Sequence, residues 1–245
     1  GATNVVVNNV DGQSTSTNTR LSFASSAPTS VSGTIANGQS EVTWTPTSFT
    51  GPAVSNYLVQ FSSDAGNTWT SATRSASTTP SMTVTGLTNG TSYVFRVAAI
   101  NSVGTGTFST ASSAVIPQTT PGQPTDLSNT AGNGFATLSW VAPTDNGGRS
   151  ITTYAVEYSS NGGSSWTEFT HANSSSTSLS VTGLTNGASY VFRVAAINSV
   201  GTGTYSNTSS SVTPQTTPGQ PTGLSGTAGD EQAELSWVAP TDNGG

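Results

Sequence analysis

One stretch of 23 residues occurs twice in this chain, and this repetition constrains the fold more than any other feature of the sequence. The first copy, GLTNGTSYVFRVAAINSVGTGTF, begins at Gly86, and the second begins 97 residues later, at Gly183. The copies differ at two positions only, where threonine becomes alanine and the final phenylalanine becomes tyrosine. A chain of 245 residues with such a period is expected to fold as consecutive small domains.

The repeat extends well beyond this stretch. Residues 28–44 match residues 124–140, and a third copy begins at Pro218 and ends after its second predicted strand. The linker sequence PQTTPGQPT is identical in its two occurrences. We therefore predict an N-terminal segment, two complete modules and the start of a third, and we interpret the sequence as part of a longer chain. The predicted boundaries are 1–24, 25–117, 118–214 and 215–245.

Each module is predicted to be all-β. In the run YVFRVAAIN, Tyr190, Phe192 and Val194 lie on one face of an extended strand, while Val191 and Arg193 lie on the other. Turn clusters such as TDNGG and SNGGS separate further short runs, of which TYSNTSSSVTP is expected to be the last strand. About seven short strands without a helical period are typical of an immunoglobulin-like β-sandwich.

These motifs resemble the fibronectin type III module. In that family a tryptophan lies on the second strand, and the tyrosine of an L-x-x-G-x-x-Y motif forms a corner at the start of the sixth. A large indole suits the position because it fills the space between sheets about 10 Å apart. The resemblance implies seven structural core residues: Trp44, Trp140, Trp237, Leu87, Leu184, Tyr93 and Tyr190.

The composition argues against several kinds of partner. Only 7% of the residues are charged, the net charge is −6, and the five basic residues are dispersed arginines. Nucleic acid and anionic membrane surfaces are therefore not expected to bind. The chain has no cysteine, which excludes disulfides and thiolate metal sites. No apolar run approaches the roughly 18 residues of a membrane span, so no membrane insertion is expected.

No group of residues has the pattern of an active site. The single histidine, His171, is expected in a solvated loop, and its counterpart in the first module is Arg74. Asp145 and Asn146 could offer oxygen ligands to calcium, but their sequence context predicts a turn. The carboxylates are scattered, and no nucleophile motif occurs. We therefore predict no enzyme activity, no cofactor and no metal site.

The outward face of the predicted sheet carries the most distinctive side chains. Glu157 and Arg193 are expected to form a cross-strand pair, with Gln60 and Arg96 at the same positions of the first module. The outward apolar residues of the first module are candidates for a contact with another chain. They are Val94, Ala98 and Ile100.

Residues 1–24 lie outside the repeat. Val5 and Val7 belong to one predicted strand, and the segment is too short to bury a core of its own. It is either the last hairpin of a preceding domain or a strand that pairs with a partner's sheet edge. In the second case, protein partners within a larger assembly would bind here.

We interpret the chain as a non-enzymatic structural array of such modules. The preferred setting is extracellular, in a fibre or decoration assembly of a virion or bacterial cell surface, with an adhesive role. Two alternatives remain open at this point. The modules could be spacers of a secreted carbohydrate-active enzyme, or they could bind a glycan or a host receptor. The sequence on either side of this chain would discriminate between them.

Overall fold

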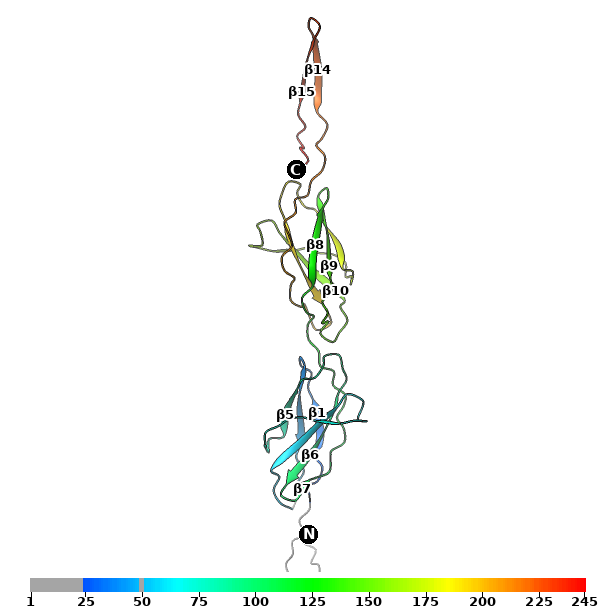
Figure 1. Ribbon diagram of the computed structural model, residues 1–245, viewed down its shortest axis with the longest axis vertical. Helices are drawn as coiled ribbons and strands as arrows, with labels where there is room; N and C mark the ends of the chain where they lie inside the picture. The colour runs from blue at the N-terminus through cyan, green and yellow to red at the C-terminus, as the bar shows by residue number, and fades with distance from the viewer. Residues whose placement is uncertain (1–23, 49–50) are drawn as a thin grey trace, which may run out of the picture. The chain divides into compact units, whose positions relative to one another are not determined.

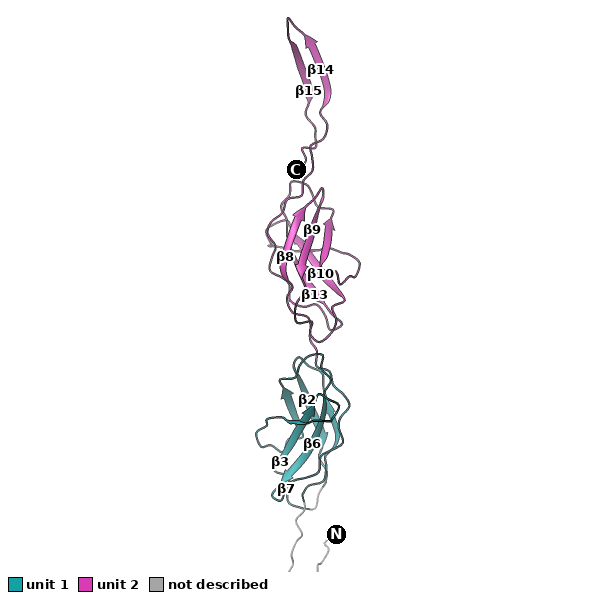
Figure 2. Ribbon diagram, turned by 45° about the vertical axis from the view of Figure 1, so that its right-hand side comes forward, with its two compact units in different colours: residues 1–117 teal, residues 118–245 magenta. Residues whose placement is uncertain are grey.

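The computed structural model describes residues 24–48 and 51–245, and the regular elements in this part of the chain are all β-strands (Figure 1). The chain divides into two compact units, residues 1–117 and 118–245 (Figure 2). Val5 and Val7 lie outside the described residues. No helix of the described residues is long and apolar enough to cross a membrane.

Unit 1 contains two antiparallel sheets with the strand orders β1-β2-β5 and β4-β3-β6-β7. Alternate side chains of both sheets point into one core, which is typical of a β-sandwich. The strands are β1 (Thr29–Gly33), β2 (Gln39–Thr45), β3 (Asn56–Ser62), β4 (Thr70–Ser71), β5 (Ser81–Thr85), β6 (Val94–Asn101) and β7 (Gly104–Thr105).

Unit 2 repeats this arrangement with the sheets β12-β9-β8 and β11-β10-β13, and it also contains the hairpin β14-β15. Its strands are β8 (Thr125–Ala131), β9 (Phe135–Val141), β10 (Thr153–Ser159), β11 (Thr167–Glu168), β12 (Ser178–Thr182), β13 (Val191–Ile197), β14 (Thr222–Ala228) and β15 (Ala233–Val238).

A tryptophan lies at the centre of each sandwich core. Trp140 is 5% exposed and packs edge-to-face on Tyr154 of the opposite sheet, with ring centroids 5.0 Å apart. Trp44 and Tyr57 repeat this contact at the same distance. Such a pair buries a large apolar area and joins the two sheets.

A tyrosine corner closes each sandwich at the start of β6 and β13. The Tyr190 hydroxyl accepts a hydrogen bond of 3.2 Å from the backbone N–H of Thr185, and Tyr93 accepts one of 3.1 Å from Thr88. Leu184 beside this corner is buried. The ring of Tyr190 is buried too, so its hydroxyl group satisfies a loop amide while the ring extends the core.

The seventh strand differs from the prediction. The segment 204–212 forms only a β-bridge, between Val212 and Tyr190, and not a regular strand. Residues 206, 209 and 212 of this segment bond to residues 194, 192 and 190, so every third residue of the segment pairs with every second residue of β13 and the position before it. The backbone amides of Ser206 and Ser209 donate to the carbonyl groups of Val194 and Phe192, at 2.7 and 2.9 Å.

Serine hydroxyl groups complete this pairing. The hydroxyl oxygens of Ser206 and Ser209 accept hydrogen bonds of 3.1 and 3.0 Å from the amides of Val194 and Phe192. Ser109 and Ser112 bond to β6 in the same way. The side chain replaces the backbone acceptor of a normal ladder, and alternation of apolar residues cannot reveal that substitution.

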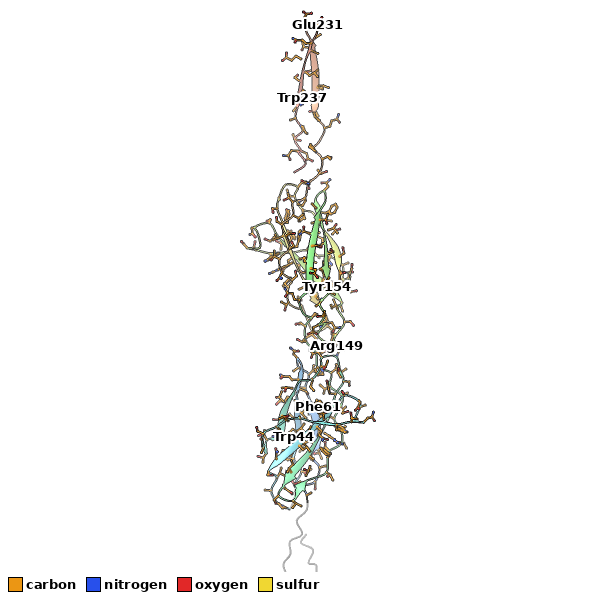
Figure 3. All side chains as sticks on the ribbon, in the orientation of Figure 1. Trp44, Phe61, Arg149, Tyr154, Glu231 and Trp237 are labelled. Atoms are coloured by element: carbon orange, nitrogen blue, oxygen red, sulfur yellow. The ribbon has the colours of Figure 1, made fainter. Side chains whose placement is uncertain are left out.

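Trp237 departs from its predicted place in a core. It lies on the β14-β15 hairpin and is 59% exposed (Figure 3). Leu224 and Leu235 of the same hairpin are also exposed. Trp140 is buried because the sheet of β10 and β13 covers it. No such second sheet follows the hairpin in the described part of the chain.

This difference predicts unequal effects of two equivalent substitutions on the free energy of unfolding. Trp140→Ala is expected to destabilise unit 2 by roughly 3–5 kcal/mol, because the core cannot fill the cavity left by the indole. Trp237→Ala should leave the unfolding of both sandwiches unchanged. Urea unfolding followed by circular dichroism measures both effects, with unit 1 as the internal reference. Equal effects of the two substitutions would contradict this assignment of the core.

Candidate interaction face

The outer face of the sheet that contains β10 and β13 carries a charged pair in the predicted position. Glu157 lies directly opposite Arg193 in the antiparallel register, and the Arg193 Nε lies 2.5 Å from the Glu157 Oε2. The expected cross-strand pair is therefore confirmed. Both side chains are half-buried, so the pair is screened less than a fully exposed one.

Two aromatic rings stack on this arginine. The Arg193 guanidinium carbon lies 4.3 Å from the ring centroids of both Trp166 and Tyr205. Trp166 precedes the short strand β11, and Tyr205 lies at the start of the segment 204–212, which is called the serine segment below. Three segments that are distant in sequence thus meet at one cation. Each cation–π contact is worth about 0.5–1 kcal/mol at such a site.

The first module builds the same stack with other neighbours. Arg96 lies 4.2 Å from the centroids of Trp69 and Phe108. Its Nε and one terminal nitrogen donate to the Gln60 Oε1 at 2.9 and 2.7 Å. An amide oxygen thus replaces the carboxylate. The stack was not recognised in the sequence, although the matched tryptophan, arginine and aromatic positions of the two copies were a usable signal.

The tryptophan rings of these stacks are not open platforms for a planar ligand. A Cβ atom on Gly163 would lie 3.3 Å from the Trp166 ring, and Gly66 has the same relation to Trp69. Each of these rings therefore lies close to a glycine of a turn as well as to an arginine. Burial raises the pKa of the Tyr205 hydroxyl, and the Glu157 carboxylate raises it further. The stack stabilises the sheet face and offers no evident reactive group.

The predicted apolar contact residues are only partly accessible. Val94 and Ile100 on β6 are half-buried, whereas Ala98 between them is fully buried and is excluded from a contact. The methyl group of Ala98 is short and, opposite Leu58 in the register of β3 and β6, it leaves no exposed surface. Val103 in the following turn is 47% exposed and was not recognised as a surface residue. Val5 and Val7 cannot be placed relative to this face.

His171 lies between two backbone carbonyl groups. Its Nε2 lies 2.9 Å from the Tyr154 carbonyl oxygen, its Nδ1 lies 2.9 Å from that of Ala172, and the ring stacks on Phe169. A small cavity of about 120 Å³ lies beside it. Arg74 in the first module donates to the backbone carbonyl groups of its own loop. Both side chains fasten the loop that follows the short strand.

The Asp145 turn serves the chain itself. The Asp145 carboxylate accepts a 2.8 Å hydrogen bond from the Gly147 amide, and its backbone carbonyl accepts another from the linker residue Gly122. Among the described residues, no three acidic or histidine side chains lie close enough together to hold a metal ion. The arrangement matches the turn that the sequence predicted.

One carboxylate has a strongly shifted pKa. Hydrogen bonds from the hydroxyl groups of Ser62 and Thr68 and from the Thr68 amide lower the pKa of Asp64 from 3.8 to about 2. In the second module Asn161 makes the corresponding bonds with Ser159 and Ser165. The two modules therefore share the geometry of this turn, but only the first carries a charge there.

A family model described as "Fibronectin type III domain" matches residues 26–115 and 122–212. Titin from Drosophila melanogaster is 30% identical over 181 residues, covering 72% of this chain and 1% of that protein. Exoglucanase B from Cellulomonas fimi is 31% identical over 183 residues, with coverages of 69% and 16%.

Two further proteins are similar to this chain. M-protein of striated muscle from Gallus gallus is 33% identical over 151 residues, covering 60% of this chain. The chain spans about a tenth of the length of that protein. Among solved structures, the FN1-FN3 domains of chicken CNTN1 match at a TM-score of 0.45 with 20% identity, covering 88% of this chain and 76% of that one.

The stack predicts that arginine contributes more than its charge. Glu157→Gln reproduces the pairing of the first module and is expected to cost about 0.2–1 kcal/mol. Arg193→Ala should cost more, because it also removes the contacts with Trp166 and Tyr205. Urea unfolding at low and high salt separates the two contributions. If both substitutions have the same effect, the aromatic contacts contribute nothing.

Asp64 predicts an acid response of the first module. Its folded pKa of about 2 lies below the unfolded value of 3.8, so its stabilising contribution is complete above 3.8. That contribution is lost as the pH falls towards 2. Asp64→Asn should flatten the pH dependence of unit 1 in this range, and Asn161→Asp should introduce it in unit 2. Unfolding midpoints measured across this pH range test both changes. An unaltered pH profile in Asp64→Asn would exclude this role of the turn.

Proposed function

The chain belongs to the fibronectin type III family, and on this premise we propose that it is a non-enzymatic spacer array within a larger protein assembly. Modules of this family generally carry no catalytic centre and commonly take part in protein interactions. The proposed task is to separate the parts of an assembly by a length that the number of modules sets.

The proposal rests on one observation: the distinctive polar side chains bond to other groups of their own module. Arg193 is enclosed by its stack, His171 and Arg74 fasten loops, and the buried Ser206 and Ser209 complete a sheet. At two corresponding positions one module has a carboxylate and the other an amide, and the local hydrogen bonds keep the same geometry. The described residues therefore supply shape and length, and no convergent set of reactive groups lies among them. Strands of seven residues at about 3.3 Å per residue give each module a length of roughly 23 Å.

The proposed setting is extracellular, in a fibre or decoration assembly on a virion or a bacterial surface, where the array has an adhesive role. Residues 1–24 would bind the neighbouring protein, because their valines need apolar partners. The absence of lysine and cysteine and the near-identity of the modules support this setting. No cofactor takes part in the proposed function.

A second candidate is a spacer within a secreted carbohydrate-active enzyme. The similarity to Exoglucanase B over most of this chain favours it specifically. In that case the catalytic domain would belong to another part of the protein. Direct binding of a glycan is less well supported, because backbone turns and arginines already cover the tryptophan rings of the sheet face.

Deletion of residues 118–214 tests the spacer function. It removes one full period and leaves the linker sequence PQTTPGQPT unchanged at the new junction. We expect incorporation to persist and the separation of the flanking parts in electron micrographs to shorten by about one module. Loss of adhesion or of enzymatic activity at unchanged incorporation would overturn the spacer proposal in favour of a binding module. Deletion of residues 1–24 should instead abolish incorporation, while circular dichroism shows both modules folded.

A further inference from the structure

The linker between the two complete modules is bonded to the module that follows it. The Thr119 amide donates to the Gly147 carbonyl at 2.8 Å, and the Gly122 amide donates to the Asp145 carbonyl at 2.8 Å. These bonds resemble a short β-ladder between the linker and the turn at residues 145–148. They fix the backbone of the linker residues from 119 to 122.

A buried asparagine completes the attachment. The Asn198 Nδ2 donates to the carbonyl groups of Thr119 and Asn146, at 2.8 and 2.9 Å. Its Oδ1 accepts from the amides of Val200 and Gly201, so the side chain is held at both ends. Asn198 is only 4% exposed, and a buried amide with all these bonds is costly to disturb.

Two glycines leave just enough space for the linker. A Cβ atom on Gly147 would lie 2.1 Å from the Thr119 carbonyl oxygen, and one on Gly203 would lie 2.2 Å from that of Pro121. No side chain fits at either position without displacing the linker backbone. Gly147 also has a φ of +71°, which favours glycine for a second reason.

The upstream end of the linker is bonded within the first unit. The Gly90 amide donates to the Pro117 carbonyl at 2.9 Å. Gly90 directly follows Asn89, whose side chain bonds to Gly38 and Asn37 in the turn that precedes β2. Pro117 is itself fully buried. The first module therefore holds the chain up to Pro117.

The second linker is attached in the same way. The Thr216 amide donates to Gly244 at 2.7 Å, the Gly219 amide donates to Asp242 at 2.8 Å, and the Pro214 carbonyl accepts from Gly187 at 2.9 Å. Identical linkers thus meet equivalent residues. The Gln215 amide also donates to Gly132, which restrains this second linker further.

From these bonds we propose that Gln118 is the hinge between the two complete modules, and that linker residues 119–122 are a fixed part of the second module. Within the part of the chain that the structure describes, the backbone of Gln118 has no hydrogen-bond partner, and its side chain accepts from the Arg149 Nε. Rotation between the modules is then confined to the dihedral angles around one residue. This inference concerns the linker alone and does not depend on the proposed function.

The width of an interspin distance distribution tests the proposal. The chain has no cysteine, so nitroxide labels at Thr85→Cys and Thr182→Cys report on the two modules alone. Both positions are exposed and lie on equivalent strands. In this labelled chain Gly147→Ala should free residues 119–122. Since the reach of a flexible linker grows with the square root of its length, five free residues in place of one should broaden the distribution about twofold.

The matched control is Gly162→Ala. Gly162 has a φ of +70°, nearly that of Gly147, but no atom lies within 4 Å of its hypothetical Cβ. Both substitutions therefore introduce similar backbone strain, and only one displaces the linker. Equal widths for the two variants would overturn the proposal, as would a wild-type distribution as broad as that of Gly147→Ala.

A second pair of variants tests the hinge itself without disturbing the linker contacts. Gln118→Pro fixes the φ angle of this residue and should narrow the distribution. Gln118→Ala removes the same side-chain bond to Arg149 but leaves φ free, and so is the control. If proline and alanine give equal widths, the hinge does not lie at Gln118. This pair also decides the question if Gly147→Ala fails to fold.

Discussion

The hydrogen bonds on both sides of β6 and β13 are the interaction on which the rest of the structure depends. β13 pairs with β10 over its whole length on one side and with the serine segment on the other. Its inward side chains, Phe192 and Val194, are fully buried, and its outward Arg193 holds the aromatic stack. Tyr190 closes the corner before it, and Asn198 binds the linker after it. The repeated 23-residue stretch therefore contains the central strand, the tyrosine of the corner before it and the asparagine that binds the linker after it.

The sequence allowed the regular part of this architecture to be predicted, because alternation of apolar residues is a local property. It predicted the strands β10 and β13, and the pairing of Glu157 with Arg193 followed from their outward positions. The serine segment was wrongly predicted as a regular strand, because its side-chain bonds do not alter the apolar pattern. The linker attachment was not found, since it joins residues about 80 positions apart, Thr119 and Asn198. The exposure of Trp237 depends on which strands cover it, and its own motif does not contain that information.

At corresponding positions the two modules keep hydrogen-bonding side chains, while the charges of these side chains differ. Glu157 corresponds to Gln60 and Asn161 to Asp64, and the members of each pair make equivalent local bonds. His171 corresponds to Arg74, and both contact backbone carbonyl groups, but those of different residues. What is common to each pair is hydrogen-bonding capacity at a given place. A catalytic or ion-binding role would require one particular charge, so the substitutions between the modules favour a structural role for all three positions.

The serine segment also bears on how neighbouring copies stay apart while they fold. Two adjacent domains with nearly the same sequence are prone to exchange strands, because each can complete the sheet of the other. A sheet invites such an exchange where a long, regular edge exposes unpaired amides and carbonyl groups. In the second module one edge of the sheet β11-β10-β13 is the two-residue strand β11, and the other is bordered by a segment whose residues pair only at every third position. Neither edge of this sheet offers the register that a neighbour's strand requires, so exchange of strands between near-identical modules is disfavoured at this sheet.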